Sequence, residues 1–229
     1  MALGGGGGGT SSSSGGNPTA ALAGIPAGLQ AQGVWAGRRQ LFVRFAAEAE
    51  TATMYTADAL ANEIKRSTGR SAFHSISISG RDPLANVEYL CAAFAKAPTP
   101  LPVMLDCDGQ RPSEITELKG VVSLAQVTLD GAGVDAMSDR ALDSIKVAAE
   151  SGMLHAVVLC VDDRTTDAMI LRLVERVHGT SEKTVVVVHP SPTTPVDKDR
   201  RWTMLFERAS ALHGDVRLAL KLPPPTGMR

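Results

Sequence analysis

From Leu41 onward, short runs of apolar and β-branched residues alternate with longer amphipathic stretches. The short runs are typical of buried strands, and the longer ones repeat their apolar positions with the period of a helix. The predicted strands are Leu41–Phe45, Phe73–Ser79, Pro102–Cys107, Ala125–Asp130, His155–Val161 and Lys183–His189. The predicted helices are Ala57–Ser67, Leu84–Ala97, Ser113–Lys119, Met137–Ser151, Thr165–Val177 and Asp197–Leu212.

This strict alternation predicts an α/β protein in which parallel strands are joined by right-handed helical crossovers. Two architectures satisfy the pattern: a partial (β/α)6 barrel and an open, doubly wound sheet. Both place functional side chains at the carboxyl ends of the strands. The residues that directly follow the strands are therefore the first candidates for a site.

The first part of the chain has a different composition, with a glycine run at Gly4–Gly9 and a serine run at Ser11–Ser14. Such a segment buries too little apolar surface to offset the entropy of ordering it. We therefore expect residues 1–27 to form a disordered tail and residues 28–229 to form one globular domain.

Composition narrows the classes of partner. The formal net charge of -1 and the pI near 6.5 create no field that favours nucleic acid or an anionic membrane. No apolar run approaches the roughly 20 residues that cross a bilayer, and no signal peptide is recognisable. We expect a cytoplasmic protein with no nucleic-acid or membrane partner. Its cysteines, Cys91, Cys107 and Cys160, lie far apart and are expected to be reduced thiols.

Acidic residues follow several of the predicted strands. Asp106, Asp108, Asp130 and Asp162 would meet at one rim, where gathered carboxylates favour a hard cation such as Mg²⁺. The alternative is structural, because Asp-Gly pairs at 108–109 and 130–131 are common in turns. Both interpretations remain open from the sequence.

Several blocks of the sequence, in order, resemble the 7-carboxy-7-deazaguanine synthases of the radical S-adenosylmethionine superfamily. The blocks are Leu29–Arg38, similar to the family's Q-G-E-G segment, Phe42–Arg44, similar to its F-V-R strand, Ser79–Leu84, similar to T-G-G-E-P-L, and Leu105–Gly109, similar to the strand ending in T-N-G. The resemblance implies a radical-SAM-like partial barrel, a carbon–nitrogen lyase ancestry in queuosine-type metabolism, a homodimer and a purine- or pterin-like ligand.

The resemblance also assigns roles to individual residues. It implies substrate contacts from Gln30, Gln32 and Arg44, and a magnesium contact from Thr56. The residues that it places against the cofactor are Ser79, Gly80, Asp82, Asp106 and Asp108. For Arg44, an ion pair with Glu48 or Glu50 is the structural alternative.

The family's cluster motif, C-x-x-x-C-x-x-C, has lost all its thiolates in this chain. Ala47, Thr51 and Met54 stand at the three positions, and a methyl, a hydroxyl and a thioether cannot replace three thiolates on iron. We expect no iron–sulfur cluster. Arg81 stands where the family has its second glycine, which disfavours S-adenosylmethionine because backbone approaches a ligand most closely without a Cβ. Whether the protein binds Mg²⁺ is left open by the sequence.

These observations favour a pseudoenzyme that binds a ligand or partner in 7-deazapurine metabolism, and whether any catalysis remains is left open. One alternative is a cluster-free, Mg²⁺-dependent enzyme that uses Asp82, Asp106, Asp108 and Asp130. A second is an active synthase-like lyase, and a third is a persisting fold that has lost its activity.

Overall fold

The structure is a computed structural model that describes residues 16–135, 139–190 and 200–220. Its strands are β1 (Thr19–Gly24), β2 (Ala27–Leu29), β3 (Arg39–Phe45), β4 (Thr53–Thr56), β5 (Ser75–Gly80), β6 (Val103–Cys107), β7 (Leu124–Leu129), β8 (Leu154–Cys160), β9 (Val185–His189) and β10 (Val216–Leu218). Its helices are α1 (Ala57–Arg70), the 3-10 helix η1 (Pro83–Asn86), α2 (Val87–Lys96), α3 (Pro112–Glu117), α4 (Gly131–Asp135), α5 (Asp139–Glu150), α6 (Asp167–Thr180) and α7 (Arg201–Leu212).

The strands form one 10-stranded sheet in the order β10-β9-β8-β7-β6-β5-β3-β1-β4, with β2 added on β3. From β3 through β5 to β10, neighbouring strands pair in parallel, whereas β1 and β2 pair antiparallel with their neighbours. The predicted α/β class with a mostly parallel sheet is confirmed. The parallel strands follow chain order without the reversal that a doubly wound sheet requires.

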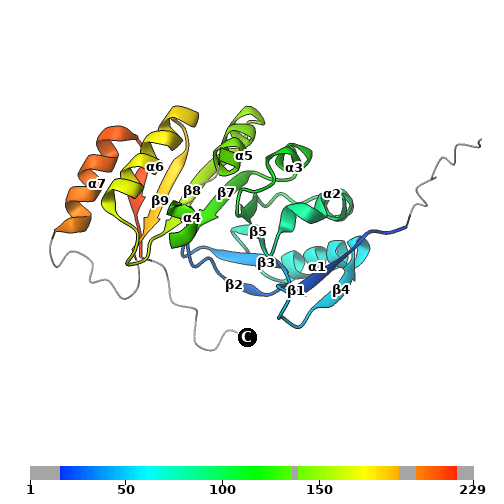
Figure 1. Cartoon of the computed structure of the whole chain (residues 1–229). Helices are drawn as coiled ribbons and strands as arrows, with labels where there is room; N and C mark the ends of the chain where they lie inside the picture. Colours follow the sequence, from blue (N-terminus) through cyan, green and yellow to red (C-terminus); the bar gives the residue numbers. More distant parts are fainter. Residues whose placement is uncertain (1–15, 136–138, 191–199, 221–229) are drawn as a thin grey trace, which may run out of the picture.

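The helices pack beside one another in the same order as the strands. In Figure 1, α2, α3, α5, α6 and α7 follow each other along one side of the sheet, while β1, β4 and α1 lie at the end farthest from α7. This arrangement follows from successive right-handed crossovers, each of which places its helix beside the previous one. Among the described residues, no helix is both long and apolar enough to span a membrane.

The two faces of the sheet differ in chemistry, as β5 shows most simply. Its alternating sequence directs Ile76 and Ile78 into the large apolar core beneath the helices. Ser75 and Ser77 point the other way, and both are fully buried. At β5 the face away from the helices is therefore polar as well as enclosed, which requires a cover on that side. On the neighbouring strands, Met104, Leu124 and Ala156 add a small apolar cluster that is separate from the main core.

The cover is the segment that joins β2 to β3, residues 30–38. The amide of Gly33 donates to Nε2 of His189 at 2.9 Å, and the amide of Val34 donates to Oε1 of Gln126 at 3.2 Å. Gly33 has a φ of +79°, and a Cβ there would lie 2.0 Å from Oε1 of Gln126. Glycine is needed at this position for both reasons. The block that resembles the family's Q-G-E-G segment thus closes the polar face.

The predicted tail requires a correction, because β1 lies inside it. Ala20 and Leu22 of β1 are buried in the core, and β1 is inserted between β3 and β4. The folded domain therefore begins by Thr19, and the predicted boundary at residues 27–28 falls within β2. Residues 1–15 of the predicted tail lie outside the described residues.

The six predicted strands and six predicted helices are all present, with ends that shift by a few residues. Residues 137–138 and 197–199, the predicted starts of two helices, lie outside the described residues. Several short elements were not predicted: β1, β2, β4, α4 and β10. All of them except β1 are too short to repeat a pattern clearly.

Candidate functional site

A hollow of about 1030 Å³ lies at the carboxyl ends of β5, β6 and β7. Its walls come from those strand ends, from the loop that leads into α3, and from the first turns of α5. The lining residues are Gly80, Arg81, Asp82, Pro83, Asp106, Cys107, Asp108, Gln110, Arg111, Pro112, Ser113, Glu114, Thr128, Arg140 and Asp143. We call this the strand-end pocket. Its position is the one that parallel α/β sheets commonly use for ligands.

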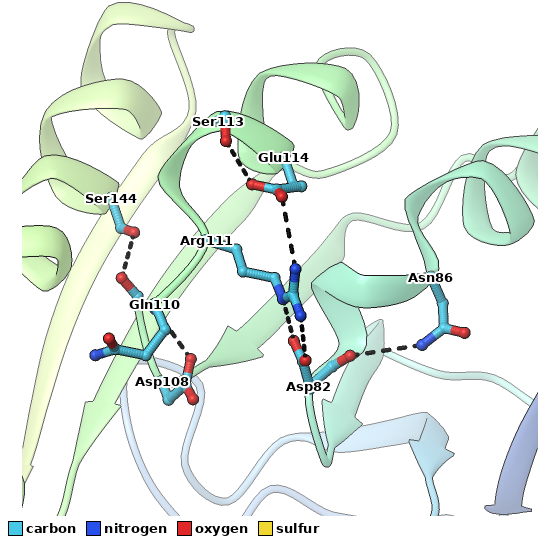
Figure 2. A network of polar contacts seen from close by, with 9 residues as sticks. Asp82, Asn86, Asp108, Gln110, Arg111, Ser113, Glu114 and Ser144 are labelled. Atoms are coloured by element: carbon cyan, nitrogen blue, oxygen red, sulfur yellow. Dashed lines mark hydrogen bonds and ion pairs between the residues drawn. The ribbon is translucent and has the colours of Figure 1, made fainter.

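Asp82 and Arg111, which both line the pocket, form an ion pair (Figure 2). Nε and one terminal nitrogen of Arg111 donate to the two carboxylate oxygens of Asp82 at 2.8 and 2.9 Å. These hydrogen bonds raise the pKa of Arg111 above its ordinary value. Asp82 has a φ of 43°, in the left-handed region, and precedes η1. An aspartate tolerates this backbone better than most residues do.

Glu114 extends this pair on α3. Its carboxylate lies 3.7 Å from Arg111 and accepts a hydrogen bond from the hydroxyl of Ser113 at 2.6 Å. The Ser113 hydroxyl is the main cause of the lowered pKa of Glu114. The arginine is therefore shared by two carboxylates from different strand–helix connections.

Asp106 and Asp108 lie at the end of β6 on either side of Cys107. Asp106 accepts a hydrogen bond from the hydroxyl of Thr128 at 2.5 Å, and Asp108 accepts one from the amide of Gln110 at 3.0 Å. Cys107 is buried in the apolar core, where desolvation raises its pKa to about 12. The thiol is thus protonated at neutral pH and unsuited to act as a nucleophile.

The turn after Asp108 is held from α5. Ser144 donates its hydroxyl to the carbonyl of Gly109 at 2.8 Å (Figure 2). Gly109 has a φ of +74°, and a Cβ there would lie 2.9 Å from Cα of Ala141. Helix α5 therefore packs directly on this turn. The same helix brings Arg140 and Asp143, both exposed, to the pocket wall.

The loop between β3 and β4, residues 46–52, is attached to the strand ends by two glutamates. Arg44 donates to Glu50 at 2.6 Å, and Arg81 donates to Glu48 at 3.0 Å. The second oxygen of Glu50 accepts from the amide of Ala47 at 3.1 Å. The Ala47 amide, followed by the charge of Arg44, lowers the pKa of Glu50. Arg44 therefore takes the ion-paired arrangement that the sequence offered as its structural alternative.

This loop and the start of β4 include the positions at which the resembled family has its cluster thiolates. Ala47 is half-buried, Thr51 is exposed, and Met54 is 65% exposed on β4, where it pairs with Ala21 of β1. None of the three carries a thiolate, so the residues present do not fit an iron–sulfur cluster.

The chain's cysteines also occupy separate environments. Cys107 is in the core, Cys91 donates to the carbonyl of Glu117 at 3.5 Å, and Cys160 donates to Oε1 of Gln32 at 3.6 Å. Cys91 belongs to α2, whereas the other two end strands on opposite faces of the sheet.

The strand-end pocket brings together Gly80, Asp82, Asp106 and Asp108 from the predicted site. Ser79, which precedes Gly80, is not among its lining residues. Gly80 has a φ of +99°, and a Cβ there would lie 2.2 Å from the carbonyl oxygen of Phe45. Its glycine is thus required by the neighbouring strand β3, independently of any cofactor.

The remaining predicted residues lie elsewhere. Gln30 is buried on the polar face, with Nε2 donating to Sδ of Met104 at 3.7 Å, and Gln32 is near it in the covering segment. Thr56, the predicted magnesium contact, caps α1: its hydroxyl oxygen accepts from the amide of Ala59 at 3.1 Å. These residues do not line the pocket.

The acidic residues proposed for a metal have mostly local partners. Asp130 accepts from the amide of Gly133 at 2.9 Å, and Asp162 is bonded by Arg164 and Thr165. Arg164 is the largest cause of the lowered pKa of Asp162. Within residues 16–135, 139–190 and 200–220, no three His, Cys, Asp or Glu side chains are arranged to hold a metal ion.

Sequence reasoning missed five of the pocket's polar side chains: Arg111, Glu114, Thr128, Arg140 and Asp143. The Arg-Pro-Ser-Glu run at 111–114 marks a helix start close to a strand end, and it could have suggested Arg111 and Glu114. Arg140 and Asp143 lie inside a helix pattern that carries no such indication.

Comparison with known proteins adds no assignment. The sequence matches no protein-family model, and no curated protein matches it significantly. With five carboxylates and three guanidinium groups around one hollow, the pocket is suited to a small polar ligand that offers both donors and acceptors.

Proposed function

We propose that this protein is a non-radical relative of the 7-carboxy-7-deazaguanine synthases. In this proposal it binds a small purine- or pterin-like ligand in the strand-end pocket and acts in the cytoplasm in 7-deazapurine metabolism as a homodimer. The fold proposed is a radical-SAM-like partial (β/α)6 barrel. Sequential parallel strands, helices along one side and a polar opposite face support it.

The observation that carries the non-radical assignment is the chemistry of the loop at residues 46–52. Two ion pairs, Arg44–Glu50 and Arg81–Glu48, attach this loop to β3 and β5. Reductive cleavage of a sulfonium requires a redox cluster held by thiolates, and this loop offers none. Arg81 also lines the pocket at the position of a family glycine, which supports a different ligand from S-adenosylmethionine.

The pocket's free charges support the ligand class. Arg140 and Asp143 have no hydrogen-bond or ion-pair partner among the described residues, and both are exposed at the pocket wall. Adjacent donor and acceptor groups of this kind match the alternating donors and acceptors along the edge of a purine or pterin ring. Arg111, by contrast, is held by Asp82 and forms a fixed wall.

The binding proposal is tested by isothermal titration with 7-carboxy-7-deazaguanine and with a tetrahydropterin. One of them should bind with one site per chain, and Arg140→Gln should weaken that binding roughly tenfold, as expected for a lost charge-assisted hydrogen bond. Arg172→Gln on α6 is the matched control, since Arg172 is also exposed but does not line the pocket. The proposal would be contradicted if neither ligand bound, or if Arg140→Gln and Arg172→Gln weakened binding equally.

The non-radical assignment is tested separately. The protein is incubated with iron and sulfide without oxygen, and its visible and EPR spectra are recorded. We expect less than stoichiometric iron and no cleavage of S-adenosylmethionine. A stoichiometric cluster that cleaves S-adenosylmethionine would establish the alternative of an active lyase.

A cluster-free, Mg²⁺-dependent enzyme is the second candidate. One observation favours it: Asp106 and Asp108 both line the pocket, where Asp106 accepts a hydrogen bond from the hydroxyl of Thr128 and Asp108 accepts one from the amide of Gln110. Asp82, however, is paired with Arg111, and the carboxylate of Asp130 accepts a hydrogen bond from the amide of Gly133 in α4. Thermal melts with Mg²⁺ and Mn²⁺ separate the candidates, because a metal that binds the folded state raises the melting temperature and Asp106→Asn would abolish that rise.

A further inference from the structure

Two histidines meet at the opposite end of the sheet from the strand-end pocket. His178 lies in the last turn of α6, and His213 follows α7. Their Nδ1 atoms are 3.4 Å apart, and the rings are nearly perpendicular. His213 is only 1% exposed, whereas the side chain of His178 is 42% exposed. The pair is thus anchored on one side and open to solvent on the other.

The other ring nitrogen of each histidine faces an oxygen. Nε2 of His213 donates to the carbonyl oxygen of Thr184 at 2.5 Å, so a neutral His213 carries its lone pair on Nδ1. Nε2 of His178 lies 3.8 Å from a carboxylate oxygen of Glu182. Metal-binding histidines commonly donate from one ring nitrogen to a carbonyl or carboxylate and direct the other nitrogen at the ion. His213 already has this arrangement, and Glu182 lies near enough to His178 to complete it after a small side-chain movement.

The separation of the inner nitrogens also suits a metal ion. Two nitrogens that each lie about 2.0–2.1 Å from a tetrahedral zinc ion are about 3.4 Å apart. We propose that His178 and His213 bind a divalent transition-metal ion of the zinc class through their Nδ1 atoms. Neutral imidazole is a preferred ligand of Zn²⁺, Cu²⁺ and Ni²⁺.

Metal binding would change which ring nitrogen of His178 carries the proton. Without metal, Nδ1–H of His178 donates to Nδ1 of His213. When metal binds, His178 carries its proton on Nε2, which faces Glu182, and Nδ1 is free to coordinate. Glu182 is a positioning residue rather than a ligand. No third His, Cys, Asp or Glu joins the pair within the described part of the chain, so water completes the coordination.

The position of the pair indicates what the ion would do. Thr184 directly precedes β9, and His213 leads into β10, so the ion would connect α6 to the amino ends of the last two strands. The inferred ion would link these elements of the fold, and it is independent of the proposed function at the other end of the strands.

The test uses full-length protein without a polyhistidine tag, stripped with EDTA and titrated with Zn²⁺ by calorimetry. One ion per chain should bind, and the melting temperature should rise. His178→Gln should lower the affinity at least tenfold, and Glu182→Gln should lower it less. Because His178 is exposed, its variant should remain folded, whereas His213→Gln would be interpreted only after its circular dichroism matches the wild type. His74→Gln, directly before the interior strand β5, is the control and should bind normally.

Cobalt distinguishes the histidine pair from the cysteines. Co²⁺ held by nitrogen and water shows visible d–d bands without the near-ultraviolet charge-transfer band of thiolate ligands. Zinc binding that His178→Gln leaves unchanged, a thiolate band with Co²⁺, or no binding at all would each overturn the inference.

Discussion

Arg111 donates two hydrogen bonds to the carboxylate of Asp82, at 2.8 and 2.9 Å, although the residues belong to different strand–helix connections. Asp82 follows β5 and Arg111 precedes α3, so the pair joins two neighbouring connections across the strand-end pocket. The pair therefore links two neighbouring parts of the pocket wall.

Two substitutions of Asp82 should distinguish the contribution of its ion pair to stability from that of its backbone conformation. Asp82→Asn removes the charge but tolerates the left-handed backbone, and because the pair is partly exposed it should cost less than about 1 kcal/mol. Asp82→Ala should cost about 1–2 kcal/mol more, since alanine is strained at a φ of 43°. Urea unfolding measures both, and equal losses in the two variants would show that the backbone is not strained.

Gly80 and Gly179 should respond oppositely to alanine. Gly80→Ala places a Cβ 2.2 Å from the carbonyl oxygen of Phe45 at a φ of +99°, and should destabilise the protein by more than about 1 kcal/mol. Gly179 lies in α6 with no atom near its absent Cβ, so Gly179→Ala should stabilise by about 0.5–1 kcal/mol. Thermal unfolding of the two variants provides the comparison, and a tolerated Gly80→Ala would contradict the close approach of β3.

The ion pair of Glu50 should make stability depend on pH. The pKa of Glu50 is below its ordinary value of 4.5 in the folded state, so its ionised form stabilises the fold above that pH. This stabilisation is lost as the pH falls through the lower, folded value. The difference in urea midpoint between wild type and Glu50→Gln should therefore shrink between about pH 6 and pH 3. A difference that stays constant over this range would show that the charge of Glu50 is not involved.

Leu22 tests whether β1 belongs to the core. It is fully buried, so Leu22→Ala should cost about 2–5 kcal/mol. Ala21 on the same strand is exposed, and Ala21→Ser should change stability by less than about 0.5 kcal/mol. The disordered tail inferred from composition would instead make both substitutions neutral.

The long elements were predictable because each carries a repeated pattern. The alternation in Ser75–Gly80 and the apolar positions of Asp167–Thr180 repeat often enough to define an element. Strand β1 was missed because small residues carry its pattern and a glycine- and serine-rich run precedes it. Strands β4 and β10 were missed because they are only 4 and 3 residues long.

The site was predictable only in part. Parallel strands place their ends together, which grouped Asp82, Asp106, Asp108 and Asp130; the first three line the pocket, and Asp130 does not. The partner of Asp82 could not be found in this way, since Arg111 is 29 positions away and reaches it through the geometry of two loops. Thr56 shows a different difficulty. The resemblance implied that it contacts magnesium, but a threonine at this position is also an ordinary helix cap.

The hydrogen bond from Gly33 to His189 joins positions 156 residues apart. The polar face can therefore be closed only after β9 has been synthesised and docked, which makes this closure a late, long-range event in folding. Once this hydrogen bond has formed, residues 30–38 can leave the sheet only if the contact with β9 is broken. The amide of Gly33 should accordingly exchange with deuterium only through large-scale opening, which makes it a reporter on the cooperativity of the whole sheet.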